Sequence, residues 1–359
     1  MSDNKTGNII LKIILKPFFG RKEKESFEID KWENVLIIRQ HNQFGDMLAS
    51  VPLFRAIKEK YPDSKITLVA GPENYFAVEK NKFIDRLVLV EKKKLFHPIY
   101  FLNLIKILHE NYDAIIVPAT VSLSSTSHLI AAPAKSNVKI APASLNEKEN
   151  PFAFLFDYRI NLNWNGNPKR HVSDFIQDII RPFGISIENL RSQISFDEDD
   201  KEFALQFVKE NTDAGKLLIG VHVGAGKIPN RWSVDNFAEI INFLREKYNA
   251  EIIFTGSDAD KETLEELFAK LKNTFPEYLN HSIPKLAALI DETDLFITND
   301  TGVLHVAAAT RVPQISIFGP TDPQNWGAVG EEKINLRNED DINSVTVNDV
   351  IESIQKLLG

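Results

Sequence analysis

Cysteine is absent from the 359-residue sequence, so the fold has no disulfide framework and no metal site built on thiolates. An excess of basic charge is absent as well. The net charge is −8 and the isoelectric point is near 5.6, which argues against a general affinity for nucleic acid. Internal repeats and low-complexity regions are also missing. What is left is a globular composition, 43% hydrophobic and 26% charged, in a chain long enough for two domains.

The N-terminal segment 8–24, NIILKIILKPFFGRKEK, is too short and too charged to span a bilayer, and it lacks a signal-peptide cleavage site. Four isoleucines would share one face of a helix, with Lys12 and Lys16 four residues apart. Two interpretations follow: a helix packed on the body of the protein, or a helix that lies in a membrane surface and attracts anionic lipid. The isoleucines are Ile9, Ile10, Ile13 and Ile14.

Short apolar runs alternate with helical patterns in the first half of the chain. Continuous apolar strands separated by helices indicate a parallel sheet covered on both faces. Segment 121–170 is less regular, and 170–185 is expected to be the closing helix of this half. The expected strands are 35–38, 66–69, 87–90 and 114–117, and the expected helices are 47–60, 74–80 and 97–110.

A second alternation begins near residue 199 and ends in a helix at 346–359. The two alternations predict an α/β protein with two Rossmann-like domains whose parallel sheets face a central cleft. Ligands in such sheets bind at the carboxyl ends of the strands, so the loops that follow the strands are expected to carry the chemistry. The expected helices are 199–210, 233–248, 258–272 and 302–310, and the expected strands are 217–223, 251–255, 294–298 and 314–318.

The loop after the first strand, RQHNQFGD, carries a carboxylate. Gly45 allows a close approach of the chain, and Asp46 follows it at the start of the helical pattern. Pro52 falls inside that pattern and removes a backbone hydrogen bond, so 45–52 is expected to be a shaped turn with a late helix start. Asp46 is then either a helix N-cap or a general base that accepts a proton from a substrate hydroxyl. It would repel a phosphate, so phosphates are expected to bind elsewhere.

The segment GVHVGAGKIPNRWS (220–233) follows a strand and combines small residues with cations. Gly224, Ala225 and Gly226 let the backbone approach a ligand, while Lys227 and Arg231 bring positive charge. This combination suits a diphosphate. The alternative is an ordinary loop with solvated cations around a packed tryptophan.

A third loop lies in TNDTGVLHVAAATRVPQISIFGPTDPQNW (298–326). Asp300, Thr301 and Gly302 open a helix, where a hydroxyl and the first free N–H groups can bind phosphate. His305 lies in the first turns of the same helix. The alternative makes Asp300 a helix cap and His305 a histidine satisfied in the interior.

In this order the loops resemble glycosyltransferase family 9, the heptosyltransferases of lipopolysaccharide core assembly. The resemblance covers residues 35–326 and includes the weaker FTGSDADKE (254–262). It implies a GT-B fold and an enzyme that transfers heptose from ADP-heptose to a lipopolysaccharide-core or related cell-envelope glycan. The reaction would invert the anomeric carbon and need neither a metal nor a cofactor.

By match of motif, the resemblance gives Asp46 the role of catalytic base, with Gly45 beside it in the acceptor-side loop. It assigns Asp300 to the donor sugar and the two residues after it, Thr301 and Gly302, to the diphosphate. His305 is expected to lie close behind them.

The chain departs from the family pattern at two places. Asn230 stands where the family usually has a lysine that contacts phosphate, so Arg231 or Lys227 is expected to replace that contact. The loop at 115–133 lacks the acidic and polar pattern that often follows this strand. The acceptor is therefore the part of the reaction that the resemblance specifies least.

The implied organisation is a leader, an N-terminal acceptor-side domain, a C-terminal donor-binding domain and a last helix that packs back on the N-terminal domain. The expected location is the cytoplasm, with peripheral contact through the leader to the inner face of the inner membrane. The expected ranges are 1–30, 31–187, 188–340 and 341–359.

Three other interpretations are weaker. Asp258 and Asp260 form an Asp-x-Asp pair that could hold a metal, but the helix dipole explains two acids in a first turn. A nicotinamide-dependent oxidoreductase would carry Gly-x-Gly-x-x-Gly after the first strand, and RQHNQFGD does not. A non-catalytic GT-B protein that binds a nucleotide or scaffolds an assembly stays open, although Asp46 and the 300–305 segment argue for an enzyme.

Overall fold

The computed structural model describes residues 5–26, 28–29, 31–40 and 43–359. Residue contacts divide the chain into two compact units, Met1–Tyr75 with Lys82–Leu190 and Phe76–Asn81 with Arg191–Gly359. His41 and Asn42 of the RQHNQFGD motif lie outside the described residues, as do positions 1–4, 27 and 30 of the expected leader. None of the helices in the described ranges is both long and apolar enough to cross a membrane.

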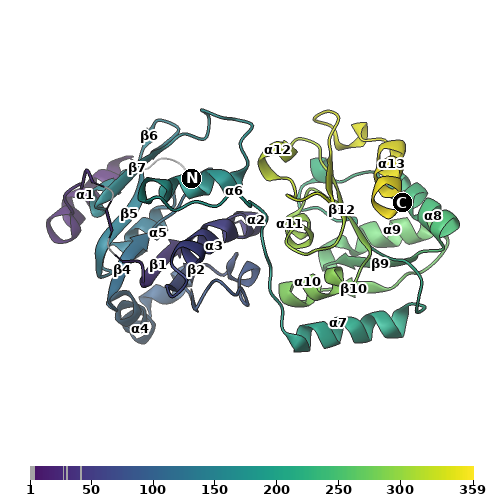
Figure 1. The fold of residues 1–359 in the computed structure, drawn as a ribbon, viewed down its shortest axis with the longest axis horizontal. Helices are drawn as coiled ribbons and strands as arrows, with labels where there is room; N and C mark the ends of the chain where they lie inside the picture. Colours follow the sequence, from purple (N-terminus) through teal and green to yellow (C-terminus); the bar gives the residue numbers. More distant parts are fainter. Residues whose placement is uncertain (1–4, 27, 30, 41–42) are drawn as a thin grey trace. The chain divides into compact units, whose positions relative to one another are not determined.

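The first unit is built on a mostly parallel sheet in the order β3-β2-β1-β4-β5, with β7 and the antiparallel β6 both paired to β5 (Figure 1). The strands are β1 (Asn34–Arg39), β2 (Lys65–Ala70), β3 (Arg86–Leu89), β4 (Tyr112–Ile116), β5 (Ser136–Leu145), β6 (Lys148–Glu149) and β7 (Tyr158–Leu162). The helices are α1 (Lys5–Phe19), α2 (Phe44–Leu48), α3 (Val51–Lys60), α4 (Pro98–Leu108), α5 (Ser125–Ala131) and α6 (Val172–Phe175).

Strand β1 lies at the point where the strand order of this sheet reverses. It pairs with β2 on one side and with β4 on the other, both in parallel. The apolar run 35–38 of β1 is buried, as expected for a strand covered on both faces, and the Arg39 that ends the strand is buried as well. Because the carboxyl ends of β1 and β4 lie at one edge, the loops that follow them meet there.

The second unit repeats the design with a parallel sheet in the order β10-β9-β8-β11-β12-β13. Its strand order reverses at β8, which pairs with β9 and β11. The strands are β8 (Leu218–His222), β9 (Glu251–Gly256), β10 (Glu277–Leu279), β11 (Leu295–Asn299), β12 (Gln314–Ile317) and β13 (Lys333–Leu336). The helices are α7 (Glu198–Asn211), α8 (Val234–Tyr248), α9 (Lys261–Leu271), α10 (Ile283–Asp291), α11 (Gly302–Ala308), α12 (Pro323–Trp326) and α13 (Val347–Leu358).

The last helix packs on the second unit, so the expectation that it returns to the N-terminal domain is wrong. Val350 and Ile354 of α13 are fully buried in the core that β8, β9, α8 and β12 share. A capping box between Thr346 and Asp349 starts the helix beside this core. The apolar stripe of α13 is thereby used within the second unit.

Several helices are shorter than the helical patterns in the sequence, and proline or glycine lies at the break in two of them. The pattern 47–60 is broken after Leu48, and Pro52 occupies the first turn of α3, which confirms the late start. The pattern 170–185 forms α6 and two 3₁₀ turns, η4 (Ile176–Ile179) and η5 (Arg181–Phe183), which end at Gly184 with φ of 66°. The pattern 74–80 contains only η1 (Tyr75–Ala77).

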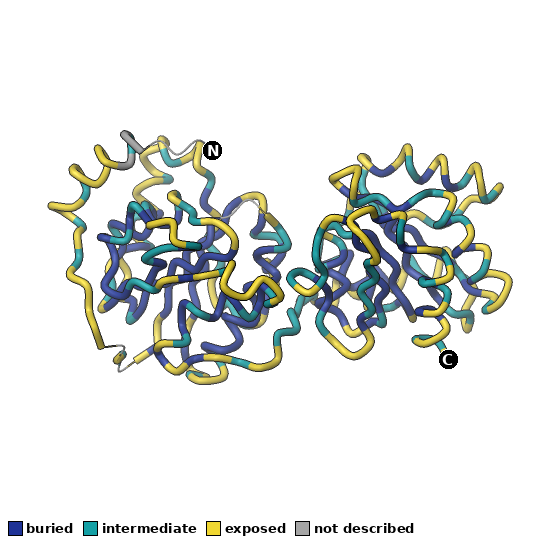
Figure 2. Tube along the Cα trace, turned by 90° about the horizontal axis from the view of Figure 1, so that it is seen from above, coloured by how far each residue is buried: buried dark blue, intermediate teal, exposed yellow. Residues whose placement is uncertain are grey.

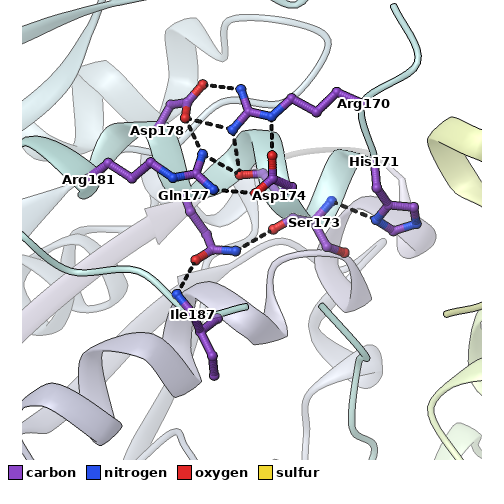
Figure 3. Close-up of polar contacts among 8 residues, drawn as sticks. All are labelled: Arg170, His171, Ser173, Asp174, Gln177, Asp178, Arg181 and Ile187. Atoms are coloured by element: carbon purple, nitrogen blue, oxygen red, sulfur yellow. Dashed lines mark hydrogen bonds and ion pairs between the residues drawn. The ribbon is translucent and has the colours of Figure 1, made fainter. Parts of the chain in front are cut away.

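Two arginines and two aspartates hold this broken segment together (Figure 3). Arg170 and Arg181 each pair with both Asp174 and Asp178, and Arg170 Nη2 donates a 2.8 Å hydrogen bond to Asp178 Oδ1. Gln177 accepts from the backbone N–H of Ile187 at 2.8 Å and donates to Ser173 O at 3.0 Å. Arg170 and Arg181 also donate to the backbone oxygen of Asp174 at 3.1 and 3.0 Å, so side chains supply some of the hydrogen bonds to the backbone of this segment.

We expect Asp174→Asn to lower the melting temperature by roughly 2–4 °C at pH 7, the equivalent of about 1 kcal/mol for a half-exposed ion pair. Burial raises the pKa of Asp174, but the hydrogen bond from Arg170 and the charges of both arginines hold that pKa below its ordinary value. A lowered folded-state pKa stabilises above the unfolded value of 3.8, and this contribution is lost as the pH falls below it. In calorimetric scans, the difference in melting temperature between wild type and Asp174→Asn should therefore shrink from pH 7 to pH 3. The control Asp63→Asn, at an exposed position, should melt at the wild-type temperature at both pH values.

Candidate functional site

Asp46 lies in the first turn of α2, directly after β1, and its side chain is 0% exposed. Thr120 Oγ1 donates a 2.6 Å hydrogen bond to Asp46 Oδ1. Arg39 Nη2 lies 3.5 Å from the same oxygen and donates to the backbone oxygen of Asp46 at 3.1 Å. The carboxylate is thus the counter-ion of a buried arginine at the reversal point of the first sheet.

Arg39 and Thr120 take part in this arrangement, although no role was expected for them from the sequence. Burial lowers the pKa of the Arg39 guanidinium, and the charge of Asp46 only partly offsets this effect. An unpaired charge in the interior costs several kcal/mol, so Asp46 has a structural role beside any chemical one. Two features of the sequence could have indicated these roles: Arg39 ends an apolar strand, and Thr120 follows the strand that pairs with it.

The N-cap interpretation of Asp46 is wrong, because Gln43 occupies that position and Asp46 lies inside α2. Gly45 is half-buried beside it, and its carbonyl accepts the backbone N–H of Ala49 at 2.9 Å. A general base needs a substrate hydroxyl within about 2.6–3.2 Å. The Thr120 hydroxyl holds that position on Oδ1 here, so the base role of Asp46 stays a prediction.

In the second unit, the loop after β8 meets the loop after β11 at the reversal point of the sheet. Asn230 Nδ2 donates to Asp300 Oδ2 at 2.8 Å and to its backbone oxygen at 3.1 Å. Burial raises the pKa of Asp300, while a hydrogen bond from Thr321 and the charge of Lys227 pull it down. Asn230, the position that departs from the family pattern, therefore holds Asp300 in place.

Hydrogen bonds with Asn299, the last residue of β11, hold both ends of the loop at 224–231. The Asn299 side chain donates to Val223 O at 2.8 Å and accepts from the backbone N–H of Trp232 at 3.2 Å. Arg231 folds back on its own loop, where Nε donates to Ala225 O at 2.8 Å. Lys227 is exposed, so it is the cation of this loop that reaches solvent most freely.

Gly224 is required by an internal contact. A Cβ at this position would lie 2.0 Å from Asp260 Oδ1, whereas a Cβ at Gly226 would meet nothing within 4 Å. Ala225 between them is buried. Asp260 is itself fixed, because its carboxylate accepts from the backbone N–H and the hydroxyl of Ser257 at 2.8 and 2.9 Å.

Thr301, Gly302 and His305 lie along the start of α11, next to Asp300. Thr301 is the N-cap residue of α11, but its hydroxyl makes no capping bond. Gly302 is exposed, and the His305 ring packs edge-on against Trp326 with ring centroids 6.4 Å apart. The structure thus brings Lys227 and the 300–302 segment together. Arg231 instead binds the backbone of its own loop, and His305 packs against Trp326.

The Asp-x-Asp pair is used locally. Asp260 forms a capping box with Ser257. Asp258 pairs with Lys261 at 2.8 Å and accepts from Asn280 at 2.9 Å. Within the described ranges, no group of three or more acidic or histidine side chains is placed to hold a metal ion.

Comparison with known proteins places the chain among sugar transferases. A sequence model described as "Glycosyltransferase family 9 (heptosyltransferase)" matches residues 101–352, well over half of the chain. Lipopolysaccharide heptosyltransferase 3 of Escherichia coli K12 is 26% identical over 340 residues, which cover 88% of this chain and 95% of that protein.

Two solved structures share the fold across both units. A family 9 glycosyl transferase from Veillonella parvula has a TM-score of 0.77 at 18% identity, covering 94% of this chain and 99% of its own. The E. coli heptosyltransferase WaaC with ADP has a TM-score of 0.71 at 18% identity, covering 90% and 99%. These likenesses confirm the expected GT-B class, two Rossmann-like domains with parallel sheets. With the family match, the chain belongs to glycosyltransferase family 9, the heptosyltransferases, and is a glycosyltransferase.

Proposed function

We propose that the protein transfers heptose from ADP-heptose to a lipopolysaccharide-core or related cell-envelope glycan, with inversion at the anomeric carbon and without a metal ion. The names of its relatives support this proposal, since several are lipopolysaccharide or lipooligosaccharide heptosyltransferases. The structural relative WaaC was solved with ADP, which supports an adenine nucleotide donor.

The observation that carries the proposal is the meeting of Lys227, Asn230 and Asp300 at the carboxyl ends of β8 and β11. A nucleotide is expected at this reversal point of an open α/β sheet. The cation suits a diphosphate, and the carboxylate suits the hydroxyl groups of a sugar. The hydroxyl of Thr301 and the backbone at Gly302 complete the diphosphate site.

The reaction needs one proton acceptor and one stabilised leaving group. Asp46 takes the proton from the acceptor hydroxyl while that oxygen forms a bond to the anomeric carbon. The bond from this carbon to the diphosphate breaks, and ADP leaves with the electron pair. Lys227, Arg231 and the hydroxyl of Thr301 stabilise the charge that develops on it.

We place the enzyme in the cytoplasm, at the inner face of the inner membrane. Helix α1 supports this placement, because its apolar side chains are mostly exposed. The isoleucines Ile9, Ile10, Ile13 and Ile14 are 53–68% exposed, and α1 rests on the body mainly through Leu15 and Phe19. An amphipathic helix of this kind binds a bilayer surface through its apolar face and its lysines.

A rescue experiment tests whether Lys227 replaces the family lysine. Lys227→Gln is expected to weaken ADP binding roughly tenfold, since a charge-assisted hydrogen bond to phosphate is lost. Asn230→Lys in that background should restore most of the affinity, because the new ammonium lies beside Asp300. Isothermal titration with ADP measures both steps. If Lys227→Gln binds ADP as tightly as the wild type, Lys227 does not contact the phosphate, and Arg231 is then the residue that replaces the family lysine.

The function itself is tested by incubating the enzyme with a panel of nucleotide sugars and a lipopolysaccharide-core acceptor. ADP release is expected from ADP-heptose and not from UDP- or GDP-sugars. The rate should be the same with and without a chelator. Loss of activity in the chelator, or a preference for another nucleotide, would overturn that part of the proposal.

A further inference from the structure

Helix α4 and the turn before it, η2 (Lys92–Phe96), expose large apolar side chains on the first unit. Phe96 is 91% exposed, Ile99 66% and Leu102 64%. The opposite side of α4 buries Leu104 and Leu108 in the core. With Phe101, which is 46% exposed, four large exposed apolar groups lie within seven residues and form a patch of the kind that marks an interaction site. We call 92–102 the η2–α4 surface.

The charges of this surface have one sign. Lys92, Lys93 and Lys94 are exposed in succession, and no Asp or Glu occurs from residue 92 to residue 109. Lys94 pairs with Glu91 at 2.5 Å, but Lys92 and Lys93 make no ion pair within the described residues. The free positive charge therefore borders the apolar patch directly.

Helix α1 packs on the same face of the first sheet. Leu15 and Phe19 of α1 contact the core cluster that Leu104 of α4 also enters. The segment 132–136 links α4 to the chain that follows α1, since the backbone N–H of Lys135 donates to Leu108 O at 2.8 Å and Arg21 donates to Ser136 O at 3.1 Å. Figure 2 shows the N-terminal helix exposed along most of its length.

We propose that the η2–α4 surface is a membrane-binding site for a bilayer with anionic headgroups. Phe96, Ile99 and Leu102 enter the boundary of the acyl chains, and Lys92 and Lys93 lie among the phosphates. Charge complementarity selects this partner. A second copy of the chain docked through the same surface would bring the two lysine clusters against each other. The inference does not depend on which sugar the enzyme transfers.

Vesicle co-sedimentation of the full-length protein tests the proposal with phosphatidylglycerol–phosphatidylcholine vesicles and with phosphatidylcholine alone. Phe96→Ser is expected to weaken binding to anionic vesicles about tenfold, since an aromatic side chain no longer leaves water. Lys92→Gln with Lys93→Gln should weaken it roughly 30-fold, because each lysine near an anionic surface gives about a fivefold gain. Binding to phosphatidylcholine should change little with the lysine variant.

Matched controls lie on α7 of the second unit. Leu205→Ser, at a residue that is 42% exposed, is the control for Phe96→Ser. Lys201→Gln with Lys209→Gln removes two positive charges from exposed positions and is the control for the lysine variant. Both controls should bind anionic vesicles like the wild type. The proposal is overturned if wild type does not bind such vesicles, or if the η2–α4 variants bind as it does. It is equally overturned if these variants convert an oligomer to a monomer in sedimentation velocity without affecting vesicle binding.

Discussion

Asp46→Asn is expected to lower kcat by about 10²–10⁴-fold, the usual contribution of a general base, while the Kd for ADP stays nearly unchanged. Asparagine keeps the size of the side chain and can still accept the hydrogen bond from Thr120, but its amide cannot take a proton. The nucleotide is expected on the second unit, so its affinity should not respond. Steady-state kinetics and titration with ADP measure the two quantities.

The buried pair with Arg39 makes this experiment ambiguous unless stability is followed too. Removing one partner of a buried ion pair costs about 3–5 kcal/mol, so Asp46→Asn is also expected to lower the melting temperature. The double variant Arg39→Gln with Asp46→Asn removes both charges and should recover much of that stability. If turnover stays low in the double variant, Asp46 acts in the chemistry. If turnover returns with stability, Asp46 only neutralises Arg39.

Thr120→Val tests how much the Thr120 hydroxyl contributes apart from the carboxylate of Asp46. The Thr120 hydroxyl donates to Asp46 Oδ1 at 2.6 Å, one of the two carboxylate oxygens that could accept a proton from the substrate. Loss of the Thr120 hydroxyl removes a buried hydrogen bond worth about 1 kcal/mol, but it leaves Asp46 Oδ1 able to accept a bond from the substrate. A drop in turnover smaller than that of Asp46→Asn is expected.

The sheets were predictable because buried parallel strands are nearly continuous apolar runs. VLII, ITLV and AIIV correspond to β1, β2 and β4, with ends shifted by one or two residues. The short strands β10 and β13 were not expected, because EYL and KINL lack such a run and pair only at the edges of the second sheet. The terminal helix was recognised, but its partner was not, since an apolar stripe does not say which core it will enter.

The site was predictable where it follows from topology. The loops after β8 and β11 were both expected to bind the diphosphate, and Asn230 indeed binds Asp300, because the two loops follow strands that pair in the sheet. The burial of Asp46 was not predictable, since it depends on Arg39, whose charge at the end of an apolar strand needs a partner. Gly224 was expected to make room for a ligand, yet its contact with Asp260 comes from a different loop and has no signal in the local sequence.

Gly224→Ala is expected to destabilise the second unit by about 1–3 kcal/mol and to weaken ADP binding at least tenfold. The new Cβ would lie 2.0 Å from Asp260 Oδ1, closer than any real contact. Asp260 cannot retreat without breaking its hydrogen bonds from Ser257, so the 224–231 loop has to move. Because Lys227 and Asn230 belong to that loop, the cation and the anchor of Asp300 would move with it.

Gly226→Ala is the matched control, because a Cβ there meets nothing within 4 Å and the residue does not have a positive φ. It should leave the melting temperature and the Kd for ADP unchanged, or raise the former slightly through a less flexible unfolded chain. Calorimetry and titration on both variants separate packing from ligand approach. Equal loss of ADP affinity in both, with stability intact, would mean that the glycines serve the ligand directly. A loss confined to Gly224→Ala and accompanied by lower stability would mean that Asp260 shapes the loop on which the diphosphate binds.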